Sequence, residues 1–112
     1  MTLTFALSSA AEADLRRIVR YSRNRWGEAQ TRIYLGKLHK GIERLAAAEP
    51  PFKNLDTLFP SLRAARCASH YVFCLGRASE PALIVAILHQ NMDLITRLAE
   101  RLDLPDAEDK FS

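Results

Sequence analysis

The chain has 112 residues, the length of one small domain that can bury a core without disulfides or a metal. Its composition is 48% apolar and 26% charged, which is typical of a globular protein and argues against general disorder. The net charge is +3, and neither a basic leader nor an apolar run of about 18 residues occurs, so we expect a cytoplasmic protein without a membrane span.

Positive charge is concentrated in the first two thirds of the chain. Residues 1–77 contain 13 Lys and Arg against 6 Asp and Glu, whereas residues 78–112 contain 3 against 7. The first part therefore suits an acidic partner, either nucleic acid or an acidic protein segment. Within the single predicted domain, residues 1–112, we expect about 104–112 to form a frayed, solvated acidic tail.

The first elements predicted along the chain are a strand and a helix. Leu3, Phe5 and Leu7 alternate with smaller or polar residues, which is the period-two pattern of a strand at or near a sheet edge. Ser8 or Ser9 can cap the helix that follows. A serine-x-x-glutamate box beginning at Ser9 places the start of this helix near residue 10.

Two helices in succession are predicted to form an antiparallel hairpin. An apolar stripe on the first helix indicates that one face packs, and it contains Ala11, Leu15, Ile18, Val19, Ser22 and Trp26. Gly27 ends this helix, and the second helix runs from Glu28 to about Ala47. Gly36 and Gly41 are costly in an exposed helix, so we expect another backbone to approach closely at both.

The second half of the chain predicts a loop and then an antiparallel meander. Pro50, Pro51 and Pro60 interrupt the loop, which we expect to lack regular structure. Three strand patterns follow, in residues 62–69, 70–76 and 82–88, and the last is apolar enough to be an interior strand covered on both faces.

Asp93 can cap a closing helix, Leu94 to Leu102. The fold class predicted is α+β: an N-terminal strand, a two-helix hairpin, a three-stranded antiparallel meander that completes a four-stranded sheet, and a short C-terminal helix. Cys67 and Cys74 match no metal spacing and are expected to be free structural thiols.

Four sequence segments resemble the ParE branch of the ParE/RelE toxin superfamily. They are AEADLRRI at 11–18, RWGEAQTRIYL at 25–35, HYVFCLG at 70–76 and ILHQNMD at 87–93, and the resemblance covers about residues 3–95. It implies a toxin encoded beside a small antitoxin. ParE-like members poison DNA gyrase, whereas RelE-like members cut messenger RNA on the ribosome, and both branches share one fold.

The resemblance implies a ParE-like toxin of a type II toxin-antitoxin system that holds gyrase on cleaved DNA and is not itself an enzyme. A ParD-like antitoxin would neutralise it in a hetero-oligomer by laying a disordered C-terminal segment over the toxin, with a helix in an apolar groove and a strand at a sheet edge. No cofactor or metal is implied. A RelE-like, ribosome-dependent mRNA endonuclease is the alternative.

Cleaving RNA through the ribose 2′-hydroxyl needs a base, cations for the phosphate and an acid. The polar groups available on the meander are Arg63, Arg66, His70, Arg77 and His89. His89 is either a base or a strand-end histidine that bonds nearby backbone, and His70 is either a ligand or a partly exposed turn residue. No tyrosine follows the last strand, and Met92 stands where a titratable group would be useful. These residues favour a binding protein over a nuclease.

Candidates for contacts with antitoxin or target include the meander residues His70, Arg77, His89 and Met92. Three further groups of residues are also candidates. Arg63 and Arg66 are either solvated strand residues or partners for carboxylates. Arg16 and Arg20 on the first helix form either a solvated face or a surface for a partner or DNA. The closing helix carries an apolar stripe that packs on the sheet or binds gyrase, the antitoxin or a second copy, and it consists of Leu94, Ile95, Leu98 and Leu102.

Overall fold

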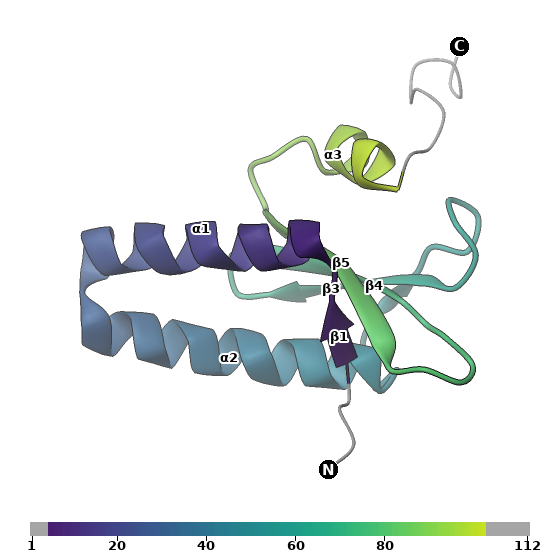
Figure 1. The fold of residues 1–112 in the computed structure, drawn as a ribbon, viewed down its shortest axis with the longest axis horizontal. Coiled ribbons are helices and arrows are strands. Elements are labelled where there is room, and N and C mark those ends of the chain that lie inside the picture. Colours follow the sequence, from purple (N-terminus) through teal and green to yellow (C-terminus); the bar gives the residue numbers. More distant parts are fainter. Residues whose placement is uncertain (1–4, 103–112) are drawn as a thin grey trace.

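The structure, a computed structural model, describes residues 5–102. The elements in chain order are β1 (Phe5–Leu7), α1 (Ser9–Trp26), α2 (Glu28–Ala46), β2 (Lys53–Asn54), β3 (Leu62–Cys67), β4 (His70–Leu75), β5 (Ala82–His89) and α3 (Leu94–Arg101), as Figure 1 shows. The predicted α+β class and element order are confirmed. Leu3 and the predicted acidic tail lie outside the described residues.

The sheet has five strands in the order β1-β5-β4-β3-β2, one more than predicted. The extra strand is β2, which pairs with β3 inside the loop that was predicted to be irregular. That prediction was wrong because the prolines flank Lys53 and Asn54 and leave their backbone groups free to pair. β1 lies at one edge, as expected, and pairs in parallel with β5, whereas β3, β4 and β5 form the predicted antiparallel meander.

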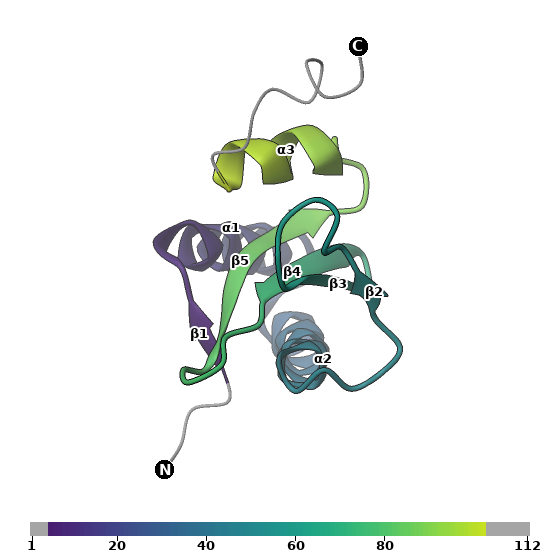
Figure 2. The same ribbon diagram turned by 90° about the vertical axis from the view of Figure 1, so that its right-hand side faces the viewer.

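The sheet has apolar cores on both faces. On one face, Ile84 and Ile87 of β5 pack against Ile18 of α1 and Leu38 of α2. On the other face, a second core contains Leu62, Ala64, Phe73, Val85, Ala86, Leu88 and Leu98. Figure 2 shows α2 and α3 on opposite sides of the sheet. β5 is therefore the interior strand, covered on both faces, that its apolar run predicted.

Capping residues determine where α1 begins and where the chain turns from α1 into α2. Ser8 accepts a hydrogen bond from the Ala11 amide at 3.1 Å, so Ser8 is the cap, and the predicted box beginning at Ser9 is wrong because α1 starts one residue earlier, at Ser9 itself. Gly27 has φ +87°, a backbone conformation that favours glycine, and it lets the chain reverse directly into α2.

The two glycines of α2 differ in their surroundings. A Cβ atom at Gly41 would lie 2.2 Å from Sγ of Cys67 on β3, so a close approach occurs there as expected, although a side chain rather than backbone makes it. Nothing lies within 4 Å of a Cβ atom at Gly36, so the same prediction for Gly36 is wrong. Cys67 and Cys74 are free and buried, as predicted. No helix within residues 5–102 combines the length and apolar character that a membrane crossing requires.

Candidate functional site

A cleft between the helical hairpin and the end of the β4–β5 pair brings both meander histidines together. Antiparallel pairing places His70, the first residue of β4, directly opposite His89, the last residue of β5. Their ring centroids are 5.3 Å apart, with the rings perpendicular. The volume of the cleft is about 300 Å³. His70 and His89 are 19 residues apart in the sequence, so the pair could not be predicted from the sequence pattern. The antiparallel pairing of β4 with β5 brings them together.

Tyr34 of α2 joins the histidines at the floor of the cleft. Its hydroxyl oxygen lies 2.5 Å from Nδ1 of His70 and accepts a hydrogen bond from the Ser69 amide at 3.3 Å. The Tyr34 hydroxyl and Nδ1 of His70 therefore share one hydrogen, which either partner donates according to the tautomer of His70. Burial raises the pKa of Tyr34 above its usual 10, so its hydroxyl keeps its proton at neutral pH.

The two histidines have different partners. Burial, together with the neighbouring His89, lowers the pKa of His70 from 6.5 to about 4, so His70 is neutral at pH 7. Nδ1 of His89 accepts from the Asn91 amide at 3.1 Å, which fixes the turn towards α3. The structural role considered for His89 is thus observed. His70 is not the simple turn residue that was the alternative to a ligand, because its ring is half-buried and bonded across to α2.

The wall of the cleft comes from α1 and the rim from the turn after β5. Tyr21 and Trp26 are 58% and 51% exposed and pack edge to face with centroids 5.9 Å apart. Arg17 and Met92 also line the cleft. The guanidinium of Arg17 forms an ion pair with Asp14, one turn earlier on the same helix.

Asp14 is a buried acid that the sequence analysis did not single out. β1 stops at Leu7, so it does not reach the Ile87 amide of β5, and Asp14 accepts from that amide at 2.9 Å in place of a strand. Arg101 of α3 donates to both Asp14 oxygens, at 2.8 and 3.2 Å. It also donates to the Val85 carbonyl at 2.9 Å. We call this set, Asp14, Val85, Ile87 and Arg101, the α3 clamp.

The clamp uses an irregularity in β5. The register with β4 passes from Ala86 directly to Ile84, so Val85 is the extra residue of a β-bulge and has no residue opposite it. Its carbonyl is therefore available to Arg101. The sequence signal for the clamp was an acid at position 14 within the apolar stripe of α1, where charged residues are rarely left unpaired.

The three meander arginines lie apart from the histidines. The half-buried Arg63 stacks on the Phe52 ring and donates weakly to the Ala46 carbonyl at 3.4 Å, which corrects its prediction as a solvent-facing residue. Arg66 is exposed and donates to the Ala68 carbonyl at 3.0 Å. Arg77 donates to the Pro81 carbonyl and forms an ion pair with Glu80 at 3.0 Å. None of the three lines the cleft.

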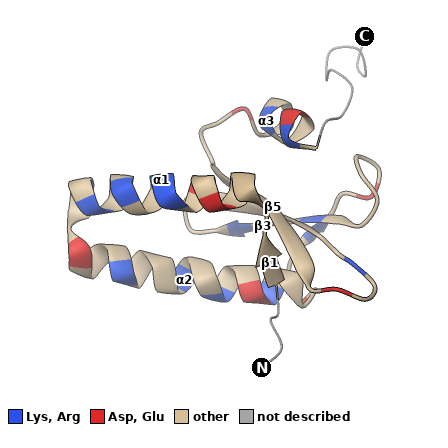
Figure 3. Ribbon diagram, in the orientation of Figure 1, with Lys and Arg blue, Asp and Glu red and all other residues tan. Residues whose placement is uncertain are grey.

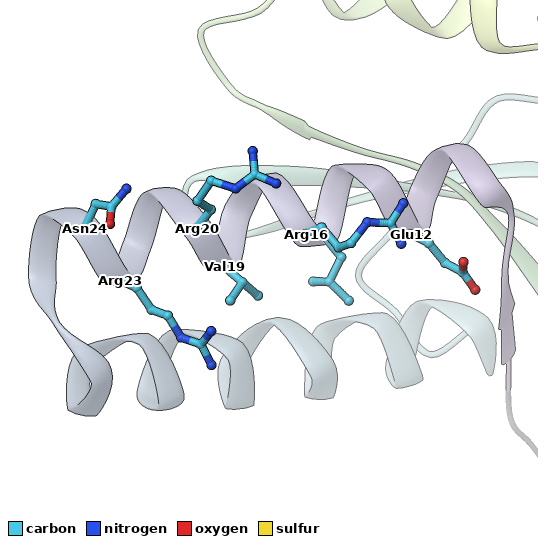
Figure 4. Close-up of a pocket in the computed structure, with 7 residues that line it drawn as sticks. Glu12, Arg16, Val19, Arg20, Arg23 and Asn24 are labelled. Carbon is cyan, nitrogen blue, oxygen red and sulfur yellow. The ribbon is translucent and has the colours of Figure 1, made fainter.

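Three arginines of α1 line a separate, open groove of about 530 Å³, namely Arg16, Arg20 and Arg23. Figure 3 shows the concentration of basic residues on this helix. Arg16 and Arg20 both border the groove, but Figure 4 shows Val19 and Arg23 pointing towards α2 while Arg20 points away. Among residues 5–102, neither Arg16 nor Arg20 has an acid in ion-pair contact. These two predicted residues therefore remain available to an anionic partner.

The apolar stripe of α3 is divided between the core and the surface. Leu98 is 3% exposed and Leu94 is half-buried, so these two residues pack on the sheet. Ile95 is 51% exposed. It borders an apolar groove of about 630 Å³ between α3, the β2 segment and the face of β3 and β4, with Lys53 and Arg66 among its lining residues. We call this the α3 groove.

Among the described residues, no group of three or more His, Cys, Asp and Glu side chains is arranged to hold a metal ion. The chemistry of the cleft is therefore that of a neutral imidazole, a hydrogen-bonded tyrosine and exposed aromatic rings beside one paired guanidinium.

Fold and sequence together define a toxin of the superfamily that the resemblance indicated. The profile of the family described as "ParE toxin of type II toxin-antitoxin system, parDE" matches residues 5–94. The chain belongs to the ParE toxin family. It is 64% identical to Toxin ParE of Escherichia coli over 98 residues, which are 88% of this chain and 95% of that protein.

More distant proteins agree with this assignment. Toxin ParE1 of Caulobacter vibrioides is 34% identical over 89 residues, covering 80% of this chain and 91% of that protein. Toxin ParE1 of Mycobacterium tuberculosis (strain H37Rv) is 33% identical over 94 residues, covering 84% and 96%. A solved structure from the chromosomal ParDE TA system of P. aeruginosa has a TM-score of 0.63 at 14% identity, covering 79% of this chain and 96% of that one, which shows the shared fold.

Proposed function

We propose that this ParE-family toxin poisons DNA gyrase by holding it on cleaved DNA, and that it acts by binding rather than by chemistry of its own. Family membership supports the proposal. So does the α1 surface, where Arg16 and Arg20 have no acid in ion-pair contact among residues 5–102 and suit an acidic or nucleic-acid surface. The observation that carries it over the nuclease alternative is the dispersal of Arg63, Arg66 and Arg77 away from the paired histidines.

The ribonuclease alternative has one specific observation in its favour. The cleft gathers His70, His89 and Tyr34 beside the guanidinium of Arg17. Stabilising the charge that develops on a phosphate during cleavage needs several cations, however, and among residues 5–102 Arg17, whose charge Asp14 partly neutralises, is the one arginine that lines the cleft. A single paired arginine makes a weak phosphate clamp. We therefore place gyrase poisoning first and the nuclease second.

A cleavage assay separates the two functions. Purified toxin, gyrase and supercoiled plasmid are incubated, and trapped double-strand breaks are counted after protease treatment. The proposal predicts more linear plasmid with toxin than without it. Intact plasmid, together with cut messenger RNA in a translating extract, would overturn it in favour of the nuclease.

Charge reversal on the helices tests which surface is involved. Replacing Arg16→Glu and Arg20→Glu together is expected to reduce plasmid cleavage at least tenfold, because an acidic surface would be repelled. Lys37→Glu with Lys40→Glu on α2 is the matched control, since both lysines are exposed. Equal losses in the two double variants would show that general charge, not the α1 surface, determines activity.

We further propose that a ParD-like antitoxin neutralises the toxin by packing an apolar segment into the α3 groove. The groove is lined mainly by apolar side chains, and the cationic Lys53 and Arg66 suit an acidic antitoxin segment. β2 is a two-residue edge strand beside the groove, so its outer edge can accept an added strand.

Two exposed isoleucines provide a matched test of antitoxin docking. Ile95 borders the α3 groove and is 51% exposed, whereas Ile33 is 56% exposed on α2 and does not border it. Ile95→Asp is expected to weaken antitoxin binding at least tenfold, and Ile33→Asp is expected to leave it within twofold, as measured by calorimetry with the purified antitoxin. Equal affinities for the two variants would refute docking in this groove.

A further inference from the structure

The cleft contains a continuous row of aromatic rings. Tyr21, Trp26, Tyr34, His70 and His89 follow one another, and each ring centroid lies 5.3–6.3 Å from the next. The row begins on the exposed surface of α1 and ends at the paired histidines. Large exposed aromatic rings next to arginine are the usual composition of a stacking surface for unpaired bases.

The hydrogen-bond pattern leaves specific groups for a ligand. Nδ1 of His70 is taken by Tyr34, and Nδ1 of His89 is taken by the Asn91 amide. Nε2 is therefore the ring atom that each histidine can offer. Because Nδ1 of His89 accepts, that ring carries its hydrogen on Nε2 and donates there, whereas Nε2 of His70 donates or accepts according to its tautomer. Both atoms suit the hydrogen-bonding groups at the edge of a base.

The charge around the cleft also suits a nucleotide. Within the described part of the chain, Asp14 is the one acid that lines the cleft, and its oxygens are occupied by the Ile87 amide and by Arg101. The guanidinium of Arg17 is 60% exposed at the side chain, so it can contact a phosphate while keeping its bond to Asp14. A cleft of about 300 Å³ has room for a base and its sugar.

We propose that this cleft binds one unpaired nucleotide of a nucleic-acid strand. The base stacks on the Tyr21 ring beside the perpendicular ring of Trp26, the Nε2 atoms of the paired histidines bond its edge, and Arg17 contacts the phosphate. A base within a duplex cannot enter, because its faces and pairing edge are occupied. This goes beyond gyrase poisoning, since it assigns the toxin its own contact with nucleic acid. Its test contains no gyrase, so failure of one proposal leaves the other standing.

Trp26 is the single tryptophan of the chain, so intrinsic fluorescence reports directly on the cleft. The full chain is titrated with a single-stranded DNA octamer, the RNA octamer of the same sequence, a duplex of that sequence and a free nucleoside monophosphate. The proposal predicts saturable quenching by single strands and at least tenfold weaker binding of the duplex. A preference for DNA, RNA or the free nucleotide identifies the source of the ligand.

Two variants and a control separate the cleft from general attraction to phosphate. Tyr21→Ala, at a position 58% exposed, is expected to weaken single-strand binding about tenfold without unfolding the protein. Arg17→Gln is expected to weaken it more than Arg66→Gln, which removes the same charge outside the cleft. Circular dichroism verifies that each variant is folded. Absent quenching, equal affinity for duplex and single strand, or equal effects of the two arginine changes would overturn the proposal.

Discussion

The α3 clamp is expected to make a large contribution to the stability of the fold, and substituting Asp14 tests this. Asp14→Ala removes a side chain that is 1% exposed and bonds both Arg101 and the Ile87 amide. Breaking a buried ion pair on one side costs about 3–5 kcal/mol, because the other charge loses its partner. Arg101 is 21% exposed and keeps its bond to the Val85 carbonyl, so water and that carbonyl offset part of the loss. We therefore expect about 3 kcal/mol.

Urea unfolding followed by circular dichroism measures this loss. For a domain of about 100 residues, 3 kcal/mol corresponds to a fall in Tm of roughly 15 °C. Arg101→Met should cost about 2 kcal/mol, because Asp14 keeps the Ile87 amide and Arg17. Glu12→Ala, an exposed acid on the same helix, is the control and should stay within about 0.5 kcal/mol of the wild type.

A double-mutant cycle isolates the pair itself. The combined Asp14→Ala and Arg101→Met variant should be less destabilised than the sum of the single variants by at least about 1 kcal/mol, because the interaction can be lost only once. Additive losses, or a cost of under about 1 kcal/mol for Asp14→Ala, would refute the claim that Asp14 and Arg101 together fasten α3 to the sheet.

Three further predictions concern stability. His70 has a pKa of about 4 when folded and 6.5 when unfolded, so unfolding takes up a proton, and stability is full above pH 6.5 and falls as the pH drops towards 4. The difference converts to at most about 3 kcal/mol, which partial exposure of the ring reduces to about 1–2. His70→Gln should flatten unfolding free energy against pH between 6.5 and 5, and an unchanged slope would contradict this origin. Gly41→Ala should destabilise the protein by about 1–3 kcal/mol in urea unfolding, because the added methyl group would clash with Sγ of Cys67. Gly36→Ala, where the methyl group meets nothing, should stabilise it by about 0.5–1 kcal/mol. The reverse order of stability would refute the packing argument. Leu98→Ala should cost about 2–4 kcal/mol by thermal unfolding, and a negligible loss would mean that α3 does not contribute to the core.

Much of the fold follows from local patterns. The apolar run of β5, the glycine between the helices and the cap at Asp93 each predicted an element at its observed position. These signals are readable because burial periodicity and capping depend on residues close together in the chain. β2 escaped prediction because its two residues form a strand only by pairing with β3, a partner that the loop sequence does not specify.

The candidate site was only partly predictable. His70, His89 and Met92 were singled out as individual residues, and the structure places all three in one cleft. Trp26 was instead assigned to packing, because an aromatic ring within an apolar stripe fits a core equally well. Arg63 was expected on the surface and proved half-buried, since alternation along β3 does not tell which face α2 covers.

The amino-acid sequence by itself determined the order of elements, the faces of the helices and the family to which the chain belongs. Tertiary structure alone decided that His70 lies opposite His89 and that Ile95 stays exposed beside a groove. It also decided that Asp14 binds Arg101, which follows it by 87 residues in the sequence. The physical reason is that periodicity reports which side of an element is buried, whereas contacts between distant side chains depend on strand register and on how helices cross the sheet.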